Sequence, residues 1–249
     1  MKNWSPTIFA VALAFFNLCG ARAEAENRVA YSIALAGIGI GDMEIAVSRE
    51  GLQYDARLEG SYRVLFWSGE LFSRAVGKVA PQGPSPSSYR STSRSDDPSE
   101  TVINFDLGQG PVDWNRTPPA PAEWREGRLP LNKEHLRDAL DPVTALAASA
   151  LGSFGGTAPD VCEKAVRIFT GFVVFELDFQ GVGVKQGNRI ACSVIYRPLS
   201  GHRADSSSVA RLAEPGSIEI LFEQLNGGVW LPARVSLPTR VGSLVVERS

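Results

Sequence analysis

Three glycines stand at alternate positions near the start of the chain, where they could form a loop that binds phosphate. They are Gly37, Gly39 and Gly41, in the stretch LAGIGIGDMEI. The dinucleotide-binding fingerprint is G-x-G-x-x-G between a strand and a helix, and its third glycine would fall on Asp42 or on Glu44. No helical pattern follows, so no helix N-terminus is expected to face a phosphate. We interpret the glycines as the turn between two antiparallel strands.

The histidines His135 and His202 are the candidates for acid–base chemistry. Ser200 and Asp205 lie close to His202 in the sequence, so a serine hydrolase with His202 as its base is conceivable. The sequence lacks the G-x-S-x-G motif that exposes the nucleophile in many such enzymes, and this composition is more typical of a polar loop. Hydrolysis is therefore kept as the alternative function.

Carboxylates alternate along the first expected strands and could also supply an acid–base pair. Glu44, Asp55 and Glu59 are examples. Two carboxylates on one face of a strand could act as a glycosidase pair, but solvent-facing positions give the same spacing without any function. Nothing distinguishes two of them from the rest. The sequence thus predicts no catalytic residue, no metal ligand set, no cofactor-binding residue and no cofactor, and we expect the protein not to be an enzyme.

Cys162 and Cys192 are the cysteines that lie outside the N-terminal region. In an oxidising compartment, two cysteines more often form a disulfide than remain free thiols. A metal site would need more ligands than two cysteines and two distant histidines, and a redox-active pair usually follows C-x-x-C. We therefore predict a disulfide between Cys162 and Cys192, which would close a loop of about 30 residues.

The N-terminus predicts export. Lys2 precedes the apolar run TIFAVALAFFNLC, and ARA at residues 21–23 is a typical small-x-small cleavage site. The run is short for a membrane span, which needs about 20 apolar residues. We expect residues 1–23 to be a cleavable signal peptide. Residues 24–249 would then be a single β-rich periplasmic domain, with no integral membrane span after cleavage.

The charge balance narrows the range of partners. The formal net charge is −2 at pH 7, whereas nucleic-acid-binding proteins normally carry a basic surface. We therefore expect no nucleic-acid partner. The net charge also gives no reason to expect electrostatic attachment to anionic lipid.

Hydrophobic residues alternate with polar ones through most of the chain, which predicts β-strands. Residues 29–35, 43–49 and 52–60 have this pattern, and residues 62–79 suggest one long aromatic-rich strand with a bend at Gly69. Similar segments continue to the C-terminus, where NGG at residues 226–228 predicts a hairpin turn.

One segment has helical spacing instead. Residues 142–151 carry apolar side chains three and four residues apart, with Asp141 as the N-cap, Pro142 in the first turn and Gly152 after the end. We expect a mainly β protein: a single curved antiparallel sheet of about twelve strands, a half-barrel or β-spiral, wrapped around one short helix.

Aromatic residues suggest a binding function. They gather in two regions, one containing Phe66, Trp67 and Phe72, the other Phe169, Phe172, Phe175 and Phe179. Most should be core, but a curled sheet of this size can enclose more apolar surface than one layer needs. We therefore expect a lipid or peptide to bind on the concave face, although the sequence assigns no residue to it.

The order of several segments resembles an exported bacterial protein family of unknown function, number 3108. The segments are YSIALAGIGIGDMEIAVS, YRVLFWSGELFSRAVGKV, DPVTALAASALG, the strand beginning at Cys162, CSVIYRPLSGHR and WLPARVSLPTRVGSLVVE. The resemblance extends from Tyr31 to Val246. It implies a periplasmic β-rich protein, akin to curled half-barrels that carry lipoproteins between membranes or to spiral-shaped envelope proteins. It brings no catalytic residues, and it implies Cys162 and Cys192 as a paired feature.

These observations predict a non-enzymatic periplasmic protein that contributes to cell-envelope integrity. It would bind a lipid, a lipoprotein or an envelope protein on its concave face. The alternative is an envelope hydrolase that uses His202 or a carboxylate pair. An apolar cavity without convergent polar groups would favour binding, and a buried acid or histidine bonded to a serine would favour catalysis.

Overall fold

A computed structural model of the chain describes residues 26–151, 161–225 and 229–249. The predicted signal peptide (1–23), Gly152 and the expected turn at 226–228 lie outside the described residues. Within the described part, three short α-helices accompany the strands: α1 (Lys133–Leu136), α2 (Pro142–Ala147) and α3 (Ser207–Leu212). A short 3-10 helix, η1, spans Ala122–Trp124.

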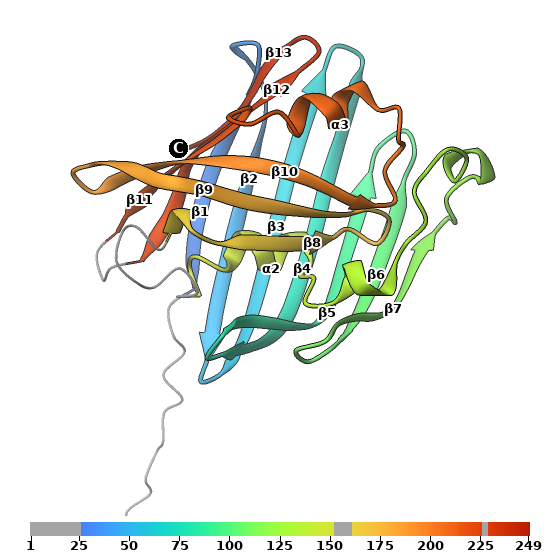
Figure 1. The fold of residues 1–249 in the computed structure, drawn as a ribbon, viewed down its shortest axis with the longest axis horizontal. Helices are drawn as coiled ribbons and strands as arrows, with labels where there is room; N and C mark the ends of the chain where they lie inside the picture. Colours follow the sequence, from blue (N-terminus) through green and yellow to red (C-terminus); the bar gives the residue numbers. More distant parts are fainter. Residues whose placement is uncertain (1–25, 152–160, 226–228) are drawn as a thin grey trace, which may run out of the picture.

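Thirteen described strands form one antiparallel sheet that curls around α2 (Figure 1). In chain order they are β1 (Asn27–Leu35), β2 (Ile38–Glu50), β3 (Gln53–Val64), β4 (Trp67–Ala80), β5 (Gly83–Arg94), β6 (Ser99–Asp106), β7 (Gly110–Thr117), β8 (Ala165–Phe169), β9 (Val174–Gln186), β10 (Arg189–Ser200), β11 (Ile218–Gln224), β12 (Trp230–Thr239) and β13 (Gly242–Arg248). The spatial order is β7-β6-β5-β4-β3-β2-β1-β13-β12-β11-β10-β9-β8. The predicted fold class is therefore confirmed.

The opening hairpin agrees with the interpretation of the glycines. Strands β1 and β2 pair on either side of the turn at Ala36–Gly37, and Gly37 has the positive φ of +82° that favours glycine. Gly41 lies farther along β2, where a Cβ atom would be only 2.1 Å from the carbonyl oxygen of Ser61 on β3. The glycines serve a turn and a close strand contact.

The single long strand expected over residues 62–79 is wrong. β3 ends at Val64, a tight turn follows at Leu65–Phe66, and β4 begins at Trp67, which pairs with Val64. Leu65 adopts a positive φ of +53°, a conformation more usual for glycine or asparagine. Two large apolar residues are unusual in a turn. The sequence therefore contains no turn signal at Leu65–Phe66, and its pattern predicts one uninterrupted strand. Gly69, expected at a bend, lies within β4 opposite Tyr62.

Helix α2 fills the inside of the curved sheet and contacts β3, β4, β5 and β8. Val143 and Ala147 belong to one buried cluster with inward-facing residues such as Tyr54, Tyr89 and Ile103. The helix begins where predicted, with Asp141 as N-cap and Pro142 in the first turn, but it ends at Ala147 and turns follow. The concave face proposed for binding is thus covered by α2 where the helix packs.

A second buried cluster surrounds the predicted disulfide, which the structure confirms between Cys162 and Cys192. Cys162 precedes β8, and Cys192 lies in β10. The bond therefore ties the edge region of the sheet to an interior strand. Both cysteines are buried beside Val194, Phe222 and Trp230.

The segment 136–141 joins the two edges of the sheet. On one side, the N–H of Asp138 donates to the carbonyl of Gln109, directly before β7. On the other, the N–H of Leu140 donates to Arg167 in β8 at 2.9 Å, and the carbonyl of Leu140 accepts from Phe169 at 2.8 Å. We call residues 136–141 the closing segment. It satisfies backbone groups that an open edge would leave exposed.

The closing segment also fixes the identity of Gly110. This residue has a positive φ of +101°, and a Cβ atom there would lie 2.2 Å from the carbonyl oxygen of Leu136. Only glycine satisfies both requirements. Farther along the same edges, the rings of Trp114 and Phe169 meet edge to face, with centroids 5.1 Å apart. The edges are thus closed by backbone bonds and by aromatic packing.

A polar network is buried where the closing segment enters α2. Asp141 is fully buried, and its Oδ1 accepts a hydrogen bond of 2.8 Å from the N–H of Thr144. The hydroxyls of Thr144 and Tyr54 bond to each other at 2.8 Å. The second oxygen of Asp141, Oδ2, has no hydrogen-bond partner among the described residues. Burial raises the pKa of Asp141 to about 6, against the opposing effect of the hydrogen bonds from Thr144.

This pKa predicts how stability changes with pH. The ordinary value of 3.8 applies to the unfolded chain, so between pH 4 and pH 6 the unfolded state releases a proton that the folded state retains. The free energy of unfolding should therefore fall as pH rises through this range, by about 3 kcal/mol for a shift of about two units. Asp141→Asn keeps a capping oxygen and should remove this fall.

Urea denaturation of the wild type and the variant between pH 4 and pH 7 measures the effect. The exposed Asp106→Asn on β6 serves as the matched control and should retain the wild-type pH dependence. Equal pH dependence in wild type and Asp141→Asn would contradict a raised pKa at this position.

Candidate functional site

A groove of about 540 Å³ opens where the two edges of the sheet approach each other. Its walls come from β7, from the connection between β7 and α1, from the β8–β9 turn and from the end of β10. We call it the seam groove and define it by Trp114, Arg116, Arg125, Arg128, Phe172 and Gly201. Its volume lies in the range of small-molecule sites, which is about 300–1,000 Å³.

Strand β7 supplies one wall of the seam groove. Trp114 and Arg116 are two residues apart and so face the same side of the strand. Trp114 packs on the core through Phe169. The guanidinium of Arg116 donates to the carbonyl of Pro118 at 2.9 Å and lies over the ring of Trp124, 5.6 Å from its centroid. The strand thus carries an arginine beside an aromatic wall.

Arg128 is held in place by several contacts. Its Nη1 donates to the carbonyl of Gly201 at 2.9 Å, and its Nε donates to the carbonyl of Trp124. The guanidinium lies over Phe172, 4.7 Å from the ring centroid, where cation and ring attract each other. The neighbouring Leu129 exchanges backbone hydrogen bonds with the end of β10. The position of the Arg128 side chain is therefore fixed by contacts within the protein.

Gly201 permits this arrangement. Its φ is +76°, and a Cβ atom would lie 2.2 Å from the carbonyl oxygen of Phe172. The backbone of β10 and the β8–β9 turn can approach each other closely only with glycine here. This approach sets Phe172 against Trp124, with ring centroids 6.1 Å apart.

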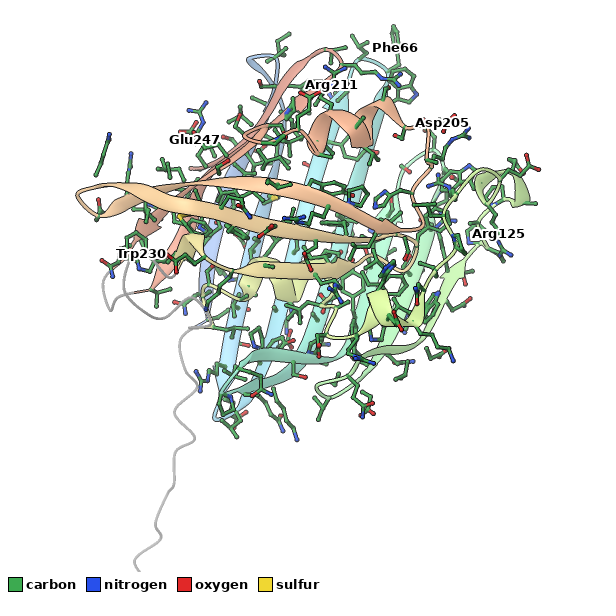
Figure 2. All side chains as sticks on the ribbon, in the orientation of Figure 1. Phe66, Arg125, Asp205, Arg211, Trp230 and Glu247 are labelled. Carbon is green, nitrogen blue, oxygen red and sulfur yellow. A yellow bond between two sulfur atoms is a disulfide. The ribbon has the colours of Figure 1, made fainter. Side chains whose placement is uncertain are left out.

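Arg125 differs from the other two arginines because its side chain has no hydrogen bond or ion pair with another described residue. It is exposed on the connection after η1, on the side of the molecule remote from Trp230 (Figure 2). The groove lining contains Arg116, Arg125 and Arg128 and no aspartate or glutamate. The charged residues of the lining are therefore all basic, and the guanidinium of Arg125 is of the kind that can bind an anion.

The two histidines lie near the groove, but His202 is not paired with a described serine as the sequence suggested. His202 contacts no serine hydroxyl among the described residues; its Nε2 is 3.2 Å from the hydroxyl of Tyr196. Burial lowers the pKa of His202 below its usual 6.5 and the charge of Arg128 adds to this, while a backbone hydrogen bond at Val174 opposes it. The imidazole of His202 is therefore held toward its neutral form.

Ser200 instead meets His135, which is 65 positions away in sequence. The distance from Ser200 Oγ to His135 Nδ1 is 2.6 Å. This is the contact of a nucleophile with its base, and it is the kind of pair that would favour catalysis. However, Ser200 is fully buried, and no carboxylate of the described residues is hydrogen-bonded to His135. The pair has the contact but lacks both access and an orienting acid.

The early carboxylates lie on the outer face of the sheet. Glu44 and Glu59 are cross-strand neighbours on β2 and β3, and Glu44 is paired with Arg28 at 3.0 Å. Burial alone would raise the pKa of Asp55, but hydrogen bonds from Arg74 and Arg57 bring it below its usual value. Asp55 is thus an ion-pair partner, and its lowered pKa is the opposite of what a general acid needs.

The described residues contain no group of three or more histidine, cysteine, aspartate or glutamate side chains that could hold a metal ion. None of their helices combines the length and the apolar character needed to cross a membrane.

Comparison with known proteins gives no match: no protein-family model, no curated protein and no solved structure is significantly similar to the chain. The resemblance to the exported family number 3108 therefore stays a prediction. Sequence reasoning missed the seam groove, because Arg116 lies near the end of a strand while Arg125 and Arg128 lie in the proline-rich connection that follows it. The available signal was the presence of Arg116, Arg125 and Arg128 beside two tryptophans within the fifteen residues of WNRTPPAPAEWREGR.

The contact between Ser200 and His135 allows a prediction that separates a structural from a catalytic role. Ser200→Ala leaves the Nδ1 atom of His135 without its partner. The free energy of unfolding should fall by about 1–2 kcal/mol, as measured by urea denaturation. Any background hydrolysis of p-nitrophenyl esters should be unchanged. A loss of esterase activity in a folded Ser200→Ala variant would instead identify Ser200 as a nucleophile.

Proposed function

We propose that the chain is an exported, non-enzymatic protein of the cell envelope that binds an anionic amphiphile in the seam groove. The ligand class is an acyl chain that carries a carboxylate or phosphate, as in a lipid or the acylated end of a lipoprotein. Through this binding the protein contributes to envelope integrity from the periplasm. One observation carries the proposal: three arginines line an aromatic-walled groove whose lining has no acid.

The chemistry of the groove suits both ends of such a ligand. Guanidinium groups form paired, charge-assisted hydrogen bonds with carboxylates and phosphates. The apolar walls, Trp114, Phe172 and the Leu129–Leu131 stretch, offer a surface for a hydrocarbon chain. A purely ionic ligand would leave these walls unused, and a neutral lipid would leave the arginines unused.

We place the ligand in the seam groove and not on the concave face that the sequence suggested. Helix α2 covers the concave face opposite β3, β4 and β5, so a chain-like ligand would have to displace it. The seam groove needs no such rearrangement. The disulfide supports export, because disulfides persist mainly in oxidising compartments.

Native mass spectrometry of protein purified from its own exported fraction tests the proposal directly. We expect a co-purifying molecule that contains an acyl chain and an acidic group. Protein that carries no such molecule, and that also fails to bind added palmitate or phosphatidylglycerol, would contradict the proposal.

Arg125 gives the sharpest variant, because no described contact of the fold depends on its side chain. Arg125→Gln should weaken binding of palmitate by roughly threefold to tenfold, through loss of one charge-assisted hydrogen bond. Thermal stability should be unchanged. Lys78→Gln, on the exposed side of β4, removes the same charge away from the groove and serves as the control. Equal affinity in both variants would exclude Arg125 from the site.

A further inference from the structure

Three hairpin turns at one end of the sheet carry exposed apolar side chains. They are the turns β1–β2, β3–β4 and β12–β13, at the top of Figure 1. The pairing places them side by side, since Leu35 of β1 is opposite Leu244 of β13 and Gly41 of β2 is opposite Tyr62 of β3. We call this set the apolar rim and define it by Ile38, Leu65, Phe66, Trp67 and Val241.

These side chains are among the most exposed apolar residues described. Phe66 is 94% exposed, Leu65 80%, Ile38 70%, Val241 67% and Trp67 60%. Figure 2 shows Phe66 projecting past the ends of the strands. Leu65 also adopts a positive φ, which is costly for a branched apolar residue. A solvent-exposed turn normally consists of polar residues and glycine. Neither solubility nor turn geometry therefore explains the large apolar residues at these three turns.

The charge around the apolar rim is locally positive. Residues 33–41, 61–69 and 237–246 contain two arginines, Arg63 and Arg240, and no aspartate or glutamate. The side chain of Arg63 has no hydrogen bond or ion pair with another described residue, and Arg240 donates to the hydroxyl of Ser207 in α3. The tips of the three hairpins therefore carry two positive charges and no negative one, and the first acidic residues, Asp42 and Glu70, follow directly in β2 and β4.

The surface next to the rim is polar. On the outer face of β2–β5, the side chain of Asp42 has no hydrogen bond or ion pair with another described residue, and Glu70 is 3.8 Å from Arg94. The β5–β6 turn at the same end contains Asp96 and Asp97. The apolar surface is thus confined to the tips of three hairpins, with acidic residues directly behind the tips in β2 and β4 and in the neighbouring β5–β6 turn.

We propose that the apolar rim docks on the surface of an anionic lipid bilayer. Separate protruding side chains can enter the headgroup region without a complementary surface, and aromatic residues with nearby cations favour that region. Arg63 and Arg240 would face the anionic headgroups. A stable protein–protein interface would instead need a continuous, well-packed apolar centre, which three separate tips with a polar flank do not offer.

This proposal goes beyond the ligand groove and does not depend on it. The groove lies at the edges of the sheet, β7 and β8, whereas the rim lies on the turns of β1–β4, β12 and β13. A variant that loses ligand binding at Arg125 should therefore keep its affinity for vesicles, so that the two proposals can fail separately.

Flotation of the exported, mature chain with vesicles tests the rim. We expect flotation with phosphatidylethanolamine vesicles that contain phosphatidylglycerol, and much less with phosphatidylcholine alone. Phe66→Ser combined with Trp67→Ser should reduce the floated fraction about tenfold, because two apolar side chains that would be buried in the bilayer surface are lost. Arg63→Gln combined with Arg240→Gln should remove the preference for phosphatidylglycerol.

The opposite end of the sheet supplies the matched control. Leu52, in the β2–β3 turn, is 64% exposed, and Leu52→Ser should float as the wild type does. Circular dichroism of each variant confirms its fold. Wild-type protein that stays in the aqueous fraction, or rim variants that float as well as Leu52→Ser, would overturn the proposal. Cross-linking from position 66 to one protein in cells, without vesicle binding, would overturn it in favour of a protein partner.

Discussion

The backbone hydrogen bonds of the closing segment are the constraint on which the other features depend. A curled sheet that does not pair its first and last strands leaves two edges whose N–H and C=O groups need partners. Asp138 and Leu140 supply these partners to the β7 and β8 sides, respectively. Because the closing segment lies between the two edges, the chain that follows it continues into the interior of the curled sheet. Helix α2 and its buried cap, Asp141, are the consequence.

Local signals made much of this fold predictable. Period-two alternation identified most strands, and Asp141 followed by Pro142 marked the start of the helix, because each signal depends on residues that are adjacent in sequence. The turn at Leu65–Phe66 was missed because it breaks the usual turn chemistry. The closing segment could not be found either, since no local pattern shows that residue 140 will pair with residues 167 and 169.

The site was harder to predict for the same reason. Ser200 and His202 are neighbours in sequence, yet the backbone at Gly201 turns with a positive φ and the two side chains find different partners, His135 and Tyr196. The seam groove combines residues 114–131 with Phe172 and Gly201. Such an assembly exists only after the edges have met. The three arginines can be read from the sequence, but only the approach of the two sheet edges brings them into one groove.

The positions where this chain departs from local rules also separate structural from functional features. Asp141 is buried with only one of its two carboxylate oxygens hydrogen-bonded, but its role as the N-cap of α2 inside the curled sheet explains its presence there. Arg125 and Phe66 are different, because no described contact of the fold requires either side chain. The exposed apolar turn with its positive φ at Leu65 supports the proposed docking on a surface outside the molecule. By the same reasoning, the guanidinium of Arg125 in a groove lined by no acid supports the proposed binding of an anion.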